Sequence, residues 1–128
     1  MRVLLDTHAL LWWIADSGRL SRKAWRLIAD ETNDIAVSAA SAWEIATKHR
    51  IGKLPGGEAV ALDVGHHIAG QGFDELPISV SDAERAGRLP GPHRDPFDRM
   101  LAAQALARRL VVVSADRVFD RYGLDRLW

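Results

Sequence analysis

The chain has 128 residues, no cysteine and a formal net charge of zero. That length suits one domain with its own core, so we expect a single domain over residues 1–128. The lack of cysteine excludes disulfides, thiolate zinc sites and a cysteine nucleophile, and the neutral balance does not indicate a strongly basic nucleic-acid binder. No apolar run approaches the ~20 residues of a membrane span and the first residues lack the layout of a signal peptide, so we expect a soluble cytoplasmic protein.

Short apolar runs, typical of buried strands, alternate along the chain with segments of helical apolar spacing. In chain order the predicted elements are a strand at 3–5, helices at 9–15 and 22–30, a strand at 35–37, helices at 38–50 and 58–69, a strand at 73–78, a short helix from a Ser81 cap to residue 89, a helix at 97–109, a strand at 110–113, a turn or short helix at 116–122 and an edge strand at 126–128. This alternation predicts an α/β fold, with a parallel sheet covered by helices on both faces.

Acidic residues follow or approach the predicted strand ends. Asp6 follows the first strand, Asp116 follows the strand at 110–113, and Glu44 lies on the helix after the second strand. Asp95 and Asp98 open the helix that leads into the fourth strand. Because open parallel sheets bind ligands at the carboxyl ends of their strands, we expect Asp6, Glu44, Asp98 and Asp116 to share one acidic pocket.

Each acid also has a local alternative role. Asp6, Asp95 and Asp116 can cap the helices that follow them, and Glu44 can pair with Lys48 one turn later. Capping does not explain the set, since Ser, Thr or Asn would serve as well at such positions. Carboxylates gathered together repel each other unless a cation is bound, and an all-oxygen pocket suits Mg²⁺ or Mn²⁺. Two such ions can activate a water against a phosphodiester.

Four segments that contain these acids resemble the motifs of PIN-domain ribonucleases, specifically the VapC-type toxins of toxin–antitoxin pairs. They are Leu-Leu-Asp-Thr-His-Ala-Leu-Leu-Trp at 4–12, Ser-Ala-Trp-Glu-Ile at 41–45, His-Arg-Asp-Pro-Phe-Asp-Arg-Met-Leu-Ala-Ala-Gln-Ala at 93–105, and Ser-Ala-Asp at 114–116 followed by Phe119. The resemblance covers essentially the whole chain in order and spacing. It implies a three-layer α/β/α sandwich with a five-stranded parallel sheet, a homodimer, Mg²⁺-dependent endonucleolytic cleavage of RNA, and a VapB-type antitoxin that blocks the site.

The resemblance also implies a role for individual residues. The metal-binding and catalytic acids would be Asp6, Glu44, Asp98 and Asp116, with Asp95 as a further possible ligand. Thr7, and Ser114 where the family often has Thr, would orient carboxylates or phosphate. The remaining candidates for substrate contact are His93, Arg94 and Arg99, with charge compensation of the acids as the alternative for the arginines.

Three alternative functions are also considered. The alternatives are a structure-specific DNA nuclease, a catalytically silent PIN module, and a receiver-like binding module, which would need paired acids after the first strand and a late lysine that this chain lacks.

The five tryptophans have two expected positions. Trp13, Trp25 and Trp43 fall on apolar helix faces and are expected in the core. Trp12 and Trp128 are candidates for an exposed contact, and an apolar patch on the first two helices would suit an antitoxin.

Overall fold

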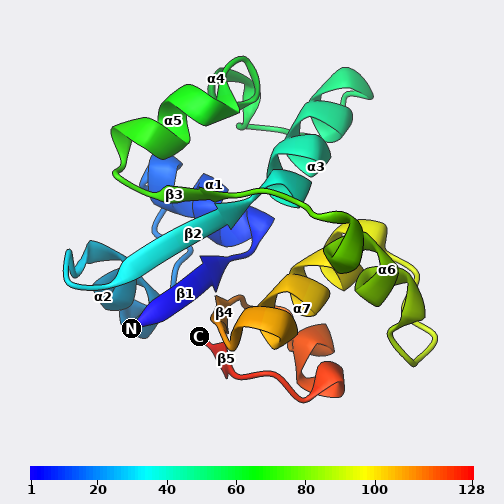
Figure 1. Cartoon of the computed structure of the whole chain (residues 1–128). Coiled ribbons are helices and arrows are strands. Elements are labelled where there is room, and N and C mark those ends of the chain that lie inside the picture. The colour runs from blue at the N-terminus through cyan, green and yellow to red at the C-terminus, as the bar shows by residue number, and fades with distance from the viewer.

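Five parallel strands form the central sheet of the computed structural model, which describes residues 1–128 (Figure 1). The strands are β1 (Arg2–Leu5), β2 (Asp34–Ser38), β3 (Asp74–Leu76), β4 (Val111–Val113) and β5 (Arg126–Leu127). Their order is β3-β2-β1-β4-β5, so β1 lies at the centre. In the register of the sheet Leu5 pairs with Val37 on one side and with Val113 on the other, which brings these three strand ends to one edge.

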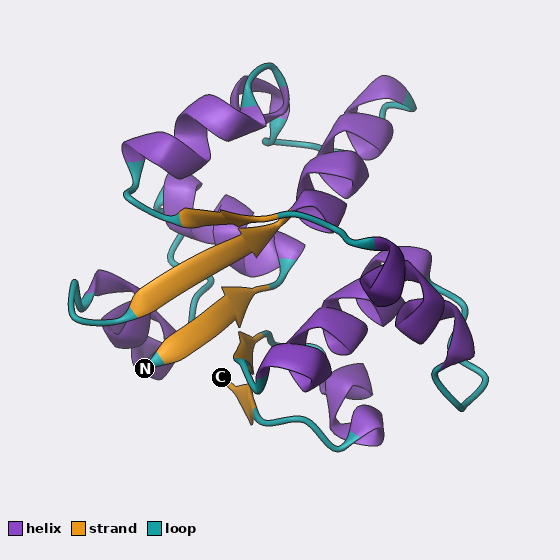
Figure 2. Ribbon diagram, viewed as in Figure 1, coloured by secondary structure: helices purple, strands orange, loops and turns teal.

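Helices cover both faces of the sheet, which confirms the predicted α/β sandwich (Figure 2). They are α1 (Thr7–Ala15), α2 (Arg22–Ala29), α3 (Ala39–Arg50), α4 (Glu58–Ala61), α5 (Val64–Gly70), α6 (Val80–Arg88), α7 (Pro96–Arg108) and a 3₁₀ helix, η1 (Arg117–Tyr122). None of these helices is long and apolar enough to cross a membrane.

Alternating side chains of the strands divide the core into two halves. Val3 and Leu5 of β1 pack with α1, α2, α4 and α5, whereas Leu4 faces α7 and η1 on the opposite side. All three side chains are fully buried. The continuous apolar run that predicted a buried strand thus supplies a core residue to each layer in turn.

Two predicted helices differ from the structure. The helix expected at 58–69 is broken at residues 62–63, because the side chain of Asp63 accepts the amide of His66 and starts α5 anew. Ser79, not Ser81, caps α6: Ser79 and Asp82 exchange side-chain-to-backbone hydrogen bonds in a capping box. The earlier cap moves the start of α6 towards β3.

The strand order also fixes where a ligand can bind. From β1 the chain runs to β2 and β3 on one side and then returns to β4 and β5 on the other. The reversal between β1 and β4 opens a crevice at their carboxyl ends, the usual ligand position in such sheets. Asp6 follows β1 directly and Ser114 follows β4 directly, so both lie at this point.

Candidate active site

Asp6 occupies the centre of the carboxyl edge. Its backbone N–H donates to the carbonyl of Val113 on β4, which ties it to the neighbouring strand. One carboxylate oxygen caps α1 by accepting the amide of Ala9 at 2.7 Å, and the other accepts the hydroxyl of Ser114. Burial raises the pKa of Asp6, and the nearby charge of Glu44 raises it further, against the lowering effect of these hydrogen bonds. Asp6 therefore caps α1 and also lies at the sheet edge where the acidic pocket is expected.

Glu44 reaches the same region from α3. Its side chain is buried, and Oε1 accepts the hydroxyl of Thr7 at 2.6 Å. Lys48, one turn along the helix, forms an ion pair with Oε2. Thr7 Oγ1 also lies 3.0 Å from the hydroxyl of the buried Ser41, a contact for which the sequence analysis assigned no role. The carboxylate of Glu44 is thus held by the hydroxyl of Thr7 and by the ammonium of Lys48, which balances its charge.

Asp98 approaches from the first turn of α7. Burial raises its pKa to about 6, and the charges of Asp95 and Glu44 act in the same direction. His93 opposes this rise through a 3.0 Å contact between its Nε2 and Oδ2 of Asp98. The influence of Glu44 on both Asp6 and Asp98 means that the three carboxylates are electrostatic neighbours.

Asp116 is the most exposed of the four acids. It borders a hollow of about 260 Å³ together with Asp6, His8, Trp12 and Ala115. Its side chain caps η1 through the amide of Val118 at 2.9 Å. Asp6 and Asp116 therefore lie on the walls of one depression at the end of β1 and β4.

The four acids are linked pairwise rather than closed into a ring. Asp116 and Asp6 share the hollow, and Glu44 influences both Asp6 and Asp98. In this conformation no three acidic or histidine side chains surround a common point closely enough to hold an ion. Three of the carboxylates already have a partner of their own: Glu44 pairs with Lys48, Asp98 contacts His93, and Asp6 accepts the hydroxyl of Ser114.

Asp95 and the predicted substrate-binding arginines have separate positions. Asp95 is the N-cap of α7 and accepts the amides of Phe97 and Asp98. Arg99 does not present its guanidinium to the crevice: it donates to the carbonyls of Ala86, Gly87, Leu89 and His93. These hydrogen bonds give Arg99 a role in fixing the loop that carries His93, and its contact with phosphate stays a prediction. Arg94 is exposed and has no ion-pair partner.

The tryptophans are more exposed than their helical spacing indicates. Trp25 and Trp43, both expected in the core, are 49% and 56% exposed. Trp13 is partly buried and donates its indole N–H to Gln71 of the α5–β3 turn. Trp12 and Trp128 contact each other at a centroid distance of 5.8 Å and are partly buried. Apolar spacing identified the helices correctly, but it did not show which face of each helix is covered by another helix or by the sheet.

Comparison with known proteins places the chain in a family. Residues 3–124 match the family described as PIN domain. The chain is 32% identical over 119 residues to ribonuclease VapC22 of Mycobacterium tuberculosis, a match that covers 90% of this chain and 87% of that protein. The chain belongs to the PIN-domain family.

Two further similarities agree with this family. Ribonuclease VapC16 of Mycobacterium tuberculosis is 44% identical over 62 residues, although the match spans only 48% of this PIN domain and 43% of VapC16. The fold is similar to that in a crystal structure of DNA-bound VapBC from Salmonella typhimurium, with a TM-score of 0.71, 20% identity and coverage of 99% and 97% of the two chains. The predicted three-layer fold with five parallel strands is thereby confirmed for the whole chain.

Proposed function

We propose that this PIN domain is a metal-dependent endoribonuclease that acts as the toxin of a toxin–antitoxin pair. The observation that carries the proposal is the set of carboxylates brought to the carboxyl edge of the sheet, where burial, with a smaller contribution from the charge of Glu44, raises the pKa of both Asp6 and Asp98. A bound dication relieves the repulsion between such carboxylates. The similarity to relatives named ribonucleases supports RNA as the substrate.

The donor set fits Mg²⁺ or Mn²⁺, because it consists of oxygen atoms and contains no thiolate. Asp6, Glu44, Asp98 and Asp116 would hold the ion or ions, in place of the present contacts with Lys48 and His93. When bound, the metal supplies an acidified water and neutralises charge on the phosphodiester. Asp95 is a further candidate ligand, and its cap hydrogen bonds already account for its position.

The other residues of the site would orient and bind. Ser114 and Thr7 hold the carboxylates of Asp6 and Glu44 in place through their hydroxyls. His93 would orient the side chain of Asp98 through the contact between its Nε2 and Oδ2 of that carboxylate. Arg94 is exposed and unpaired at the entrance to α7, so its guanidinium is available to a phosphate of the substrate.

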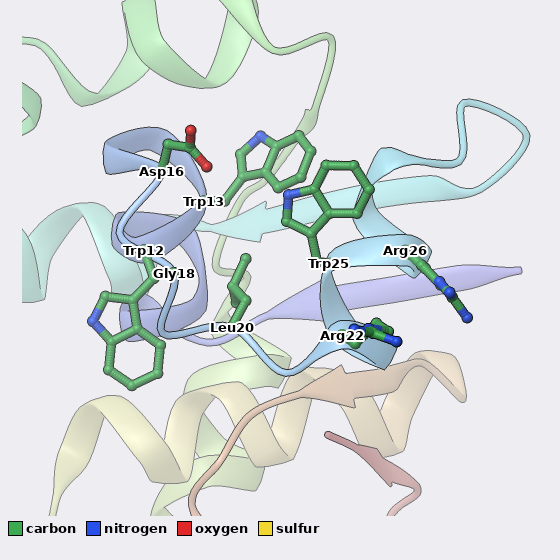
Figure 3. A pocket seen from close by; sticks show the side chains of 8 residues that line it. All are labelled: Trp12, Trp13, Asp16, Gly18, Leu20, Arg22, Trp25 and Arg26. Atoms are coloured by element: carbon green, nitrogen blue, oxygen red, sulfur yellow. The ribbon is translucent and has the colours of Figure 1, made fainter.

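An antitoxin would dock on the groove between α1 and α2. Trp13, Leu20 and Trp25 form an aromatic and aliphatic floor in this pocket of about 400 Å³, with Arg22 and Arg26 on its rim (Figure 3). The rings of Trp13 and Trp25 lie 6.0 Å apart. An apolar floor with a basic rim fits a partner segment that carries apolar and acidic side chains. We further propose a homodimer and a cytoplasmic location, as the family resemblance implies.

The nuclease proposal is tested by incubating single-stranded RNA and DNA of one sequence with the protein, in Mg²⁺, in Mn²⁺ and in EDTA. We expect internal cleavage of RNA only when metal is present. Asp6→Asn should lower the rate by more than ~100-fold, a larger loss than that usual for residues outside the ligand sphere. Glu31→Gln is the matched control, since this acid is exposed and precedes β2 at the opposite edge of the sheet. Cleavage of DNA alone, or RNA cleavage that survives EDTA, would overturn the proposal.

A further inference from the structure

Trp43 is a large aromatic side chain that stands uncovered beside the acidic cluster. It lies on α3 directly before Glu44, and 56% of its surface is exposed. Its neighbours on the same face of the helix, Ala39 and Ala46, are small and exposed. Nothing on this helix therefore shields the indole from solvent, although exposing so large an apolar ring is unfavourable.

Phe97 fixes the ring of Trp43 across the gap between two acid-bearing helices. The two rings meet edge to face, with centroids 4.7 Å apart and an interplanar angle of 76°. Phe97 directly precedes Asp98 on α7, as Trp43 directly precedes Glu44 on α3. The aromatic pair therefore joins the two helices at the positions next to these two acids. Edge-to-face contact restricts the ring plane and so pre-organises an aromatic surface.

Two exposed arginines lie on the elements that carry this aromatic pair. Arg50 is exposed on the same face of α3, two turns beyond Trp43 and so about 10 Å away along the helix axis. Arg94 is exposed three residues before Phe97. An exposed ring with unpaired arginines on the same elements suits single-stranded nucleic acid, because bases stack on aromatic rings and phosphates bind cations.

We propose that Trp43 stacks on a nucleobase of single-stranded RNA adjacent to the phosphodiester that the acids address. This proposal rests on the ribonuclease function proposed above and adds a binding subsite to it. Stacking uses the π-face that every base possesses, so the subsite accepts any base and contributes affinity rather than a strict sequence preference.

The test measures binding of a labelled short single-stranded RNA by fluorescence anisotropy, with Asp6→Asn present throughout to prevent cleavage. Adding Trp43→Ala should weaken binding about 10-fold, whereas Trp43→Phe, which keeps an aromatic face, should stay within about threefold. The dependence of log Kd on log salt should be unchanged, because an indole releases no counter-ions from phosphate. Ile51→Ala is the control: this residue is an exposed apolar side chain at the end of the same helix, with 46% exposure.

A second RNA, which lacks one base, gives a further comparison. The chain that keeps Trp43 should bind this abasic RNA more weakly than the intact RNA. The Trp43→Ala variant should bind the two RNAs with equal affinity. Equal affinity of the Trp43→Ala and parent chains, or a loss matched by Ile51→Ala, would overturn the subsite while leaving ribonuclease activity in place. A change of oligomeric state on Trp43→Ala in size-exclusion chromatography would also overturn it, since Trp43 would then contact a second copy. Failure of the parent chain both to bind and to cleave RNA would overturn the ribonuclease proposal together with the subsite.

Discussion

Asp98 links the stability of this PIN domain to pH. Burial, with the charges of Asp95 and Glu44, raises the pKa of Asp98 from 3.8 to about 6. The folded chain therefore holds this proton more tightly than the unfolded chain does. The contribution of Asp98 to stability is complete below about pH 4 and is lost as the pH rises through about 6.

Asp98→Asn should therefore stabilise the metal-free protein at pH 7, by about 1 kcal/mol once partial exposure of the carboxyl is taken into account. At pH 4 the difference between the two chains should shrink, because the native carboxyl is then protonated. Denaturant unfolding in EDTA at both pH values measures the effect. With Mg²⁺ well above its Kd for the parent the order at pH 7 should reverse, since the parent binds the ion more tightly and gains more stability from it. A variant less stable than the parent at pH 7 in EDTA would contradict this account.

The sequence singles out the candidate acids, but it does not show how they are arranged relative to one another. Asp6, Glu44 and Asp98 could be selected because they follow or precede apolar runs within recognisable motifs. Their counter-ions depend on geometry: Lys48 was foreseeable from helical spacing, whereas the contact of His93 with Asp98 requires a loop to fold back on α7. Trp43 was misplaced in the core because apolar spacing does not reveal whether another element covers that side of a helix.

At the scale of elements, α6, α7 and the loop between them form one unit held by Arg99. Its guanidinium donates to four carbonyls at the end of α6 and in the loop that carries His93. Charge-assisted hydrogen bonds of this kind are stronger than neutral ones, and their loss leaves several carbonyls unpaired. Arg99 is therefore a positioning residue for His93 and, through it, for Asp98.

Arg99→Ala should lower the free energy of unfolding by about 1–3 kcal/mol and reduce kcat for RNA more than it raises KM. Arg99→Lys should recover only part of either loss, because an ammonium cannot span the four carbonyls. Arg88→Ala is the control, since its guanidinium is highly exposed and pairs only with Glu84, and it should change stability by less than about 1 kcal/mol. If Arg99→Ala instead leaves stability intact and weakens RNA binding with a smaller salt dependence, Arg99 binds phosphate as first expected.

The elements themselves were largely predictable, and the errors have local causes. Every strand was placed correctly to within a few residues, because apolar runs bounded by polar residues are a strong signal. The break between α4 and α5 was missed although Asp63 is a good cap, since the apolar spacing continues through it. The true cap of α6 was also encoded, in the spacing of Ser79 and Asp82, but Ser81 offered an equally plausible start.

At the scale of the whole molecule, the order of the strands decides whether the site exists. The sequence predicts parallel strands but not that β1 lies between β2 and β4. That order is what joins Asp6 to Ser114, residues 108 positions apart in the chain, and brings Asp116 into the same hollow. The α1–α2 groove lies on the face of the sheet opposite α6 and α7, so a partner there would begin its contact away from the loop that carries His93.

The proposed pairing of toxin and antitoxin predicts a phenotype. Expression of this chain alone in a bacterial host should arrest growth, because the nuclease is then unopposed. Asp6→Asn should be expressed at the same level without arrest, and viable counts with matched immunoblots measure both. Co-expression of an antitoxin that binds the α1–α2 groove should restore growth, and Trp25→Ala should weaken that rescue by removing part of the apolar floor. Normal growth despite abundant, folded, RNA-cleaving protein would contradict the toxin role.

The central claim is that the carboxylates near the end of β1 bind a dication together. Isothermal titration of Mn²⁺ and Mg²⁺ into the metal-free chain at pH 7.5 tests it without RNA. We expect saturable binding that is weakened at least ~10-fold by each of Asp6→Asn, Glu44→Gln and Asp98→Asn, and is retained by Asp95→Asn, whose asparagine still caps α7. Absence of binding by the parent chain, or equal binding by all the variants, would contradict the claim.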